Sequence, residues 1–243
     1  MNDIEFRKFL WLSSVPLVRL NKKGIPSDMG SGCFIDYCGK RILLTVSHLF
    51  KKYKKWAIQL KYILGKGVEP YPLSGMNFLA EGSLSETKLK NIDFSYIEVP
   101  SNLCAYRQEV EISQGVLNIK SETQIIVHSP TLTETPKPDD KYGFCGIVMP
   151  EVEKHPYHTI LDGKPFIYSD LSFIRTKDDY HFFTSPFPKL DHRYFKGCSG
   201  APIFSSSGSL VALVCGGCKK TNEIYGISVS AFKIQIDILV GNI

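Results

Sequence analysis

The stretch K-G-C-S-G-A-P-I-F, residues 196–204, sets a serine among glycines and follows it with an apolar segment. Gly197 and Gly200 permit a tight turn in which a side chain would clash. Such a turn can expose the Oγ of Ser199 and direct backbone N–H groups at one point, as stabilisation of an oxyanion requires. Glycine and serine are also common in ordinary turns, so this stretch indicates a nucleophile only if partner residues lie elsewhere.

A serine hydroxyl near neutral pH needs a base within hydrogen-bonding distance. Among the six histidines, His48 is the strongest candidate, because L-L-T-V-S-H-L-F (residues 43–50) places it where an apolar strand ends. A strand end is a rigid platform with an open edge. The alternative is a structural histidine that caps the strand, which is the commoner role of an isolated case.

The base in turn needs a carboxylate that fixes its tautomer. Asp93 is the best candidate, because it precedes an alternating apolar strand in K-N-I-D-F-S-Y-I-E-V, residues 90–99. Asp170 and Asp191 are alternatives, but neither opens such a strand. An aspartate before a strand also commonly forms a turn, and that interpretation stays open.

Short apolar and β-branched segments recur along the chain and are separated by Gly, Pro, Asn and Asp turns. The pattern predicts an all-β protein built from barrels or a sandwich, with its first strand at residues 15–20. Further strands are expected at residues 30–36, 41–47, 56–64, 94–99, 123–129, 142–149, 166–175, 181–185, 201–205, 209–215 and 224–230. A C-terminal helix is expected over residues 232–239, a weaker N-terminal helix over 2–11, and an exposed proline-rich loop at 130–140.

Composition limits the classes of protein that the chain can be. Its 243 residues are 43% hydrophobic, which suits one large β domain or two small lobes and not a disordered chain. No apolar run is long enough to cross a bilayer, and no secretory signal is expected, so the prediction is a cytoplasmic protein. The seven cysteines are odd in number and show no staple pattern, which favours free thiols in a reducing compartment.

The order His48, Asp93, Ser199 resembles that of the chymotrypsin-like (trypsin-fold) serine peptidases. T-V-S-H-L-F is similar to the segment around that family's base histidine, N-I-D-F-S-Y-I-E-V to its aspartate strand, and G-C-S-G-A-P to its nucleophile motif. G-S-G-C-F-I-D, residues 30–36, resembles the strand before the histidine in the simpler bacterial branch. Three motifs in the family's order are far more specific than any one of them.

This resemblance implies two antiparallel six-stranded β-barrels with the active site between them. We expect an N-terminal barrel over residues 15–115, a C-terminal barrel over 120–230 and a C-terminal helix over 231–243. Ser199 would attack, His48 would act as general base and Asp93 would orient it, with the N–H groups of Gly197 and Ser199 as oxyanion hole.

The same resemblance implies a polypeptide substrate that pairs with the strand carrying Val214, Cys215 and Gly216. It implies no metal and no organic cofactor. Narrow specificity or a regulatory protein partner would restrain such an enzyme in the cytoplasm, as would suit a stress or anti-phage response. The runner-up hypothesis is a degenerate peptidase that binds peptides or a partner without cutting them.

Two departures from the secreted members of this family affect the prediction. Leu49 stands where those relatives have a cysteine, so Cys33 has no partner there. Cys198 replaces the aspartate that binds a newly cut N-terminus, so activation by N-terminal insertion is not expected. Cys198 could itself be taken for a nucleophile, but the two glycines frame Ser199.

The specificity pocket is expected between L-D-H-R-Y-F-K (residues 190–196) and residues 225–229. His192 or Arg193 at its base would favour an acidic side chain before the cleaved bond. The commoner alternative is that both are solvated loop residues.

Two more features have a structural and a functional interpretation. The run K-K-Y-K-K-W, residues 51–56, could follow a phosphate backbone, but such a run more commonly forms a solvated loop, and no nucleic-acid partner is expected. Cys215 and Cys218 form a C-x-x-C without a second ligand pair, so a strand-end turn is favoured over metal or redox work.

Overall fold

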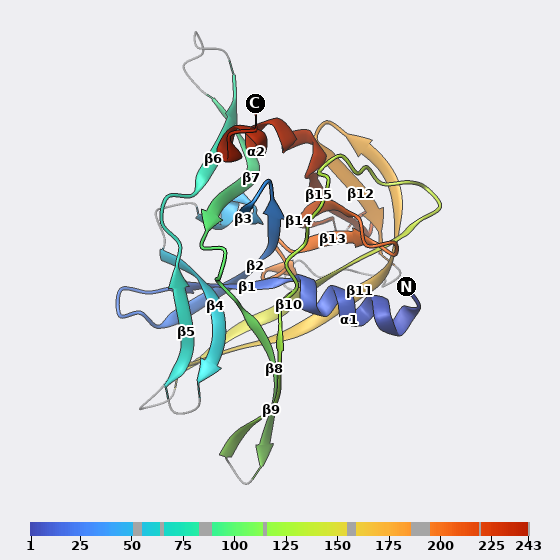
Figure 1. The fold of residues 1–243 in the computed structure, drawn as a ribbon. Helices are drawn as coiled ribbons and strands as arrows, with labels where there is room; N and C mark the ends of the chain where they lie inside the picture. The colour runs from blue at the N-terminus through green and yellow to red at the C-terminus, as the bar shows by residue number, and fades with distance from the viewer. Residues whose placement is uncertain are drawn as a thin grey trace.

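The computed structural model describes residues 1–50, 55–63, 66–82, 89–113, 116–154, 159–185, 195–218 and 220–242. The chain is built almost wholly of antiparallel strands, in two halves with a helix near each terminus (Figure 1). The all-β class predicted from the alternating pattern is therefore confirmed.

The first half forms a seven-stranded sheet in the order β5-β4-β1-β2-β3-β7-β6. Its strands are β1 (Val15–Leu20), β2 (Pro26–Tyr37), β3 (Lys40–Thr45), β4 (Lys55–Ile63), β5 (Gly67–Pro72), β6 (Asn77–Glu81) and β7 (Lys90–Val99). β2 pairs with β1 through Gly32 and with β3 from Cys33 onward, so this one strand joins the two parts of the sheet. A single-turn helix, η1 (Ser47–Phe50), follows β3 directly.

The second half is a closed barrel in the order β10-β11-β12-β15-β14-β13. Its strands are β10 (Lys141–Lys154), β11 (Thr159–Lys177), β12 (Tyr180–Thr184), β13 (Pro202–Ser205), β14 (Leu210–Cys218) and β15 (Glu223–Ser228). Closure is made where β10 pairs with β13, and it leaves no sheet edge around most of the barrel. A hairpin of β8 (Tyr106–Ser113) and β9 (Val116–Gln124) connects the halves.

The N-terminal helix α1 (Asp3–Ser13) lies against the second barrel (Figure 1). Asn2 and Glu5 form a reciprocal capping box, which satisfies two N–H groups at the start of the helix. The ring of Phe9 packs edge-on against Phe204 of β13 at 4.9 Å. The N-terminus of the chain is therefore packed against the C-terminal barrel.

The C-terminal helix α2 (Lys233–Val240) packs in turn against the sheet of the first half (Figure 1). The ring of Phe232 stacks on Phe94 of β7 with centroids 4.8 Å apart, and the Tyr37 hydroxyl donates to Asp237 at 2.8 Å. The two terminal helices thus each bind the other half, which stabilises the arrangement of the two walls of the site.

Several element predictions are confirmed and one is wrong. β1 and α2 lie where the pattern placed them, and residues 130–140 form an irregular segment. The strand predicted at residues 123–129 is wrong beyond Gln124, where β9 ends. Ile125 is buried and Val127 packs against the core, so the apolar alternation marks an extended connection and not a ladder.

The first half differs in strand number from the predicted six-stranded barrel. Its sheet has seven strands with β5 and β6 at the ends, and no pairing between those two occurs among the residues that the structure describes. The predicted division between residues 115 and 120 falls inside the β8–β9 hairpin. In the part of the chain that is described, no helix is long and apolar enough to cross a membrane.

Candidate active site

A cleft of about 250 Å³ is lined by residues from both halves. The residues that line it are Arg19, Asp28, Met29, His48, Leu49, Trp56, Phe195, Lys196, Ser199, Cys215 and Gly216. The first sheet and η1 supply six of these residues, and β14 with the turn before β13 supplies the rest.

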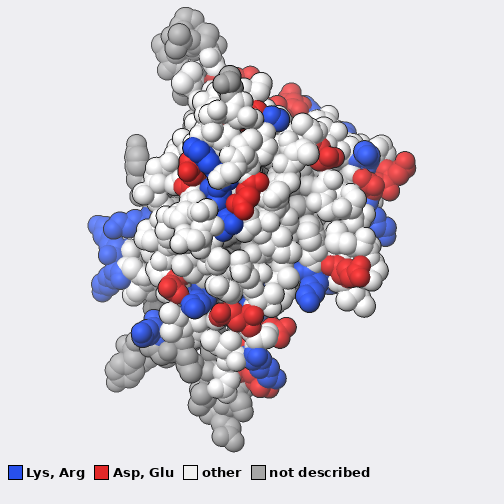
Figure 2. Space-filling view, in the orientation of Figure 1, with Lys and Arg blue, Asp and Glu red and all other residues white. Residues whose placement is uncertain are grey.

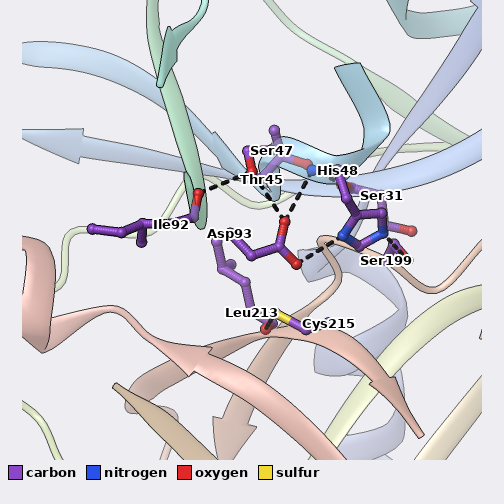
Figure 3. A network of polar contacts seen from close by, with 9 residues as sticks. All are labelled: Ser31, Thr45, Ser47, His48, Ile92, Asp93, Ser199, Leu213 and Cys215. Atoms are coloured by element: carbon purple, nitrogen blue, oxygen red, sulfur yellow. Dashed lines mark hydrogen bonds and ion pairs between the residues drawn. The ribbon is translucent and has the colours of Figure 1, made fainter. Parts of the chain in front are cut away.

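Three of the predicted residues meet at this cleft (Figure 3). The Nε2 of His48 lies 2.8 Å from the Oγ of Ser199, and its Nδ1 lies 2.8 Å from the Oδ2 of Asp93. Asp93 comes from β7 and His48 from η1, whereas Ser199 precedes β13. An Asp–His–Ser relay of this geometry can move a proton from the serine hydroxyl to the imidazole.

Asp93 is held as an ionised group by the start of η1. Its Oδ1 accepts from the His48 backbone N–H at 2.9 Å and from the Ser47 hydroxyl at 3.1 Å (Figure 3). Burial by itself raises the pKa of this carboxyl, but the hydrogen bonds and the charge of His48, together with Ser47, lower the pKa below its usual value. The carboxylate therefore stays charged beside the imidazole and can stabilise an imidazolium.

The turn that carries Ser199 is fixed by β2. The Ser31 N–H donates to the Ser199 carbonyl at 2.8 Å, and the Ser31 hydroxyl donates to the Gly197 carbonyl at 3.0 Å. Gly200 has φ +85°, and a methyl group there would overlap the Ser31 carbonyl oxygen and the Thr45 hydroxyl. The glycine at this position is thus required both by its backbone angle and by the close approach of β2.

Cys198 points away from the cleft. It is fully buried, and its Sγ contacts the Ile147 carbonyl at 3.6 Å. Burial raises its pKa, so the thiol stays protonated. The neighbouring Ser199, and not this cysteine, has its side chain against His48.

The predicted substrate strand β14 includes Val214, whose N–H and C=O bond Ala201 and Gly200 and whose side chain is buried. Cys215 and Gly216 do line the cleft. β14 pairs with β13 only as far as Leu213. Beyond Leu213, among the described residues, β14 pairs as a strand only with β15.

Cys215 lines the cleft and interacts electrostatically with Asp93. Burial raises its pKa well above the usual value, and the negative charge of Asp93 raises it further. The sequence suggested a C-x-x-C turn for Cys215 and Cys218, and the structure places both on β14 as free thiols. The other five cysteines are free as well.

The remaining predicted residues do not join this cluster. Asp170 pairs with Lys141 on the surface at 3.1 Å. Asp191, His192 and Arg193 lie outside the described residues, as does most of the lysine run at 51–56. No cluster of His, Cys, Asp and Glu that could hold a metal ion occurs within the described ranges.

Sequence reasoning missed the residues that support and surround the three. Ser31 bonds the turn that carries Ser199, Thr45 bonds the Ser31 carbonyl, and Ser47 bonds Asp93. Their hydroxyls occur in segments already singled out as motifs. Arg19 and Asp28 line the cleft although neither belongs to a motif. Only pairing of β1 with β2 could have revealed them, because it sets these two residues opposite each other.

No sequence profile of a protein family matches the chain, and no curated protein matches it by sequence. Solved structures do. The serine endoprotease from Yersinia pestis is 11% identical, with a TM-score of 0.55 over 99% of this chain and 67% of its own. Human heparin binding protein is also 11% identical, with a TM-score of 0.57 over 98% of this chain and 94% of its own.

The chain has the trypsin fold. The predicted resemblance to chymotrypsin-like proteins is therefore confirmed at the level of architecture. One neighbour is named for proteolysis and the other for binding heparin, so the trypsin fold alone leaves the activity open.

Proposed function

We propose that this protein is a serine endopeptidase that cleaves polypeptides through an acyl-enzyme. The observation that carries the proposal is the pair of 2.8 Å contacts that join Asp93, His48 and Ser199 across two halves of the chain. Ser199 attacks the scissile carbonyl carbon while His48 accepts the hydroxyl proton. His48 then protonates the leaving amine, and Asp93 stabilises the imidazolium between these steps.

The rest of the mechanism is supplied by backbone. The N–H groups of Gly197 and Ser199 would bind the oxyanion, with the turn held in place by Ser31. Extended substrate on the acyl side would pair with β14 beyond Val214, where Cys215 and Gly216 line the cleft. Deacylation repeats the sequence with water as nucleophile.

The proposal predicts covalent labelling of one serine. A fluorophosphonate should add to the wild-type protein and not to Ser199→Ala, as read by intact mass and by mapping of the labelled peptide. Cys198→Ala should still be labelled, because its thiol is buried away from His48. Ser101→Ala, which removes a serine from an exposed turn, is the matched control. Equal labelling of wild type and Ser199→Ala contradicts the assignment.

A second candidate is a trypsin-fold module that binds a peptide or a partner without cleaving it. One structural neighbour, human heparin binding protein, is named for binding and not for cleavage, so the trypsin fold is compatible with this candidate. The two candidates differ in one measurement. Well-folded protein that no fluorophosphonate labels at neutral pH supports the binder, and labelled protein that also cuts peptides supports the enzyme.

We also propose that the enzyme is selective and works in a reducing compartment such as the cytoplasm, where its seven free thiols would persist. A peptide-library profile should show a few efficiently cut sequences. Indiscriminate digestion of casein at low enzyme concentration would contradict this selectivity.

A further inference from the structure

Three charged side chains form a connected group along one side of the cleft. The Nη1 of Arg19 lies 3.1 Å from the Oδ2 of Asp28, and the Nζ of Lys196 lies 3.7 Å from its Oδ1. Arg19 belongs to β1 and Asp28 to β2, whereas Lys196 belongs to the turn that carries Ser199. All three line the cleft with Ser199, so the group links both halves beside the nucleophile.

Arg19 is fixed in direction and still has donors to offer. Its Nε donates to the Ser27 hydroxyl at 3.0 Å and its Nη2 donates to the Ser27 carbonyl at 3.4 Å. With the Asp28 contact, each guanidinium nitrogen uses one N–H. Because a guanidinium carries five N–H groups, one remains at Nη1 and one at Nη2. A ligand would therefore meet a donor pair whose orientation is already set.

Lys196 is the most exposed member of the group. Its side chain is 61% exposed, while that of Asp28 is 17% exposed. The long contact to Asp28 holds the ammonium loosely, so it can turn to a second carboxylate without leaving the cleft.

The charge of this region is positive. Of the described residues that line the cleft, Arg19 and Lys196 are the two with basic side chains longer than histidine's, and Asp28 is the one carboxylate. Lys22 and Lys23 stand exposed at the tip of the β1–β2 hairpin, a few residues beyond Arg19. Figure 2 shows Lys and Arg side chains gathered at the left edge of the molecule, where Figure 1 places that hairpin.

The reaction geometry places this group on the leaving-group side of the scissile bond. His48 must protonate the departing amine, so the chain that follows the bond starts beside the imidazole. The cleft lining includes Leu49, which follows His48 in η1, Met29 of β2, and Lys196, which lies in the turn that carries Ser199. The acyl side instead runs along β14, whose residues in the cleft are Cys215 and Gly216.

We infer that Arg19, Asp28 and Lys196 form a specificity site for a substrate carboxylate on the leaving-group side of the cleaved bond. This inference rests on the proposed peptidase function. A Glu or Asp side chain within the first few residues after the bond would accept from Lys196 and from the remaining N–H groups of Arg19. Asp28 orients Arg19 and, by its own charge, limits how strongly both cations attract the substrate.

The test compares quenched fluorogenic peptides that share one acyl side, chosen from the library profile, and carry Glu, Gln or Lys at one position after the cleaved bond. At low salt, the kcat/KM of wild type for the best-placed Glu peptide should be about tenfold higher than for the matching Gln peptide. One hydrogen bond to a charged group is enough to give a preference of this size. The preference should shrink at high salt, because this part of the cleft is open to ions.

Three variants should move the preference in known directions. Lys196→Gln and Arg19→Gln each lower the Glu-to-Gln ratio towards one. Asp28→Asn raises the ratio, because it frees both cations from their internal carboxylate. Lys120→Gln, which breaks an exposed pair with Glu111 on the β8–β9 hairpin, is the matched control and should leave the ratio unchanged.

Fluorophosphonate labelling separates failure of this inference from failure of the proposed function. If wild type is labelled but shows no Glu preference, the specificity site is wrong and the proposed peptidase function stands. The same conclusion follows if Lys196→Gln and Arg19→Gln retain the full Glu preference. If nothing is labelled or cleaved, the peptidase is wrong, and the inference, which rests on it, falls with it.

Discussion

The two walls of the cleft contribute in different ways. Under the proposed function, the first-half wall would act through side chains, namely His48, Asp93, Arg19 and Asp28. Apart from Ser199 and Lys196, the second-half wall would act through backbone, in the turn that carries Ser199 and along β14. Substitutions on the first wall should therefore change chemistry while the fold persists, whereas substitutions on the second should act through geometry.

The largest effect should come from breaking the contact that joins the walls. Ser199→Ala or His48→Ala should lower turnover by ~10⁴-fold or more, because the nucleophile and its base act as one unit. Steady-state cleavage of a library-selected peptide measures this, with thermal melting to confirm the fold. Ser101→Ala should behave as wild type. Turnover of Ser199→Ala at the wild-type rate would contradict the mechanism.

A methyl group on the second wall should act through geometry. Gly200→Ala adds the cost of an alanine at φ +85° to an overlap with the Ser31 carbonyl. We expect at least about 2 kcal/mol of lost stability. Displacement of Ser199 by the order of 1 Å should cost roughly 10²-fold in kcat.

Gly39→Ala is the matched control for this substitution. Gly39 has φ +78° with nothing within 4 Å of the added methyl. The Gly39→Ala substitution therefore has only the conformational cost of an alanine at positive φ, without a steric overlap. Chemical denaturation should show the smaller loss of stability for Gly39→Ala, with activity unchanged. Equal losses in the two variants would mean that β2 does not constrain the nucleophile turn.

The stability of the contact between the two halves should depend on pH. His128 is partly buried against the rings of Phe9 and Phe204, with no described partner for its Nε2, and this burial lowers its pKa to about 4. The unfolded chain, with a histidine pKa near 6.5, binds this proton first. Stability is therefore unaffected above pH ~6.5 and falls as pH decreases towards 4, by at most roughly 3 kcal/mol.

His128→Leu should remove that part of the slope between pH 6.5 and 4 while the backbone bonds of residue 128 remain. Urea unfolding across this range measures the slope. His181, whose pKa burial also lowers to about 4, keeps a residual slope in the variant. An unchanged slope in His128→Leu would show that this histidine does not titrate with unfolding.

The smallest effect should come from the hydroxyl that joins the walls behind the nucleophile. Ser31→Ala removes the bond to the Gly197 carbonyl and keeps the backbone bond to Ser199. Loss of one buried hydrogen bond of about 1 kcal/mol should lower kcat about fivefold with KM little changed. Ser121→Ala, on the exposed β9 strand, is the control. A rise in KM without change in kcat would place the Ser31 effect in binding instead.

The sequence by itself determined the β class, the start of the first strand, the C-terminal helix and which Ser, His and Asp meet. Each rests on a local signal: an alternation of period two, a glycine-framed turn, or a polar residue at a strand end. The same local reading misplaced the strand at 123–129, because an extended connection packed on the core shows the same alternation as a paired strand.

Only the tertiary structure decided what surrounds those three residues. Val214 has its backbone bonded to the nucleophile turn, Ser31 holds that turn from β2, and Lys196 meets Asp28 from the other half of the chain. Contacts between residues this far apart in sequence depend on strand order, register and the crossing of the two terminal helices. No local pattern in the chain records these, because they arise only when the two halves pack against each other.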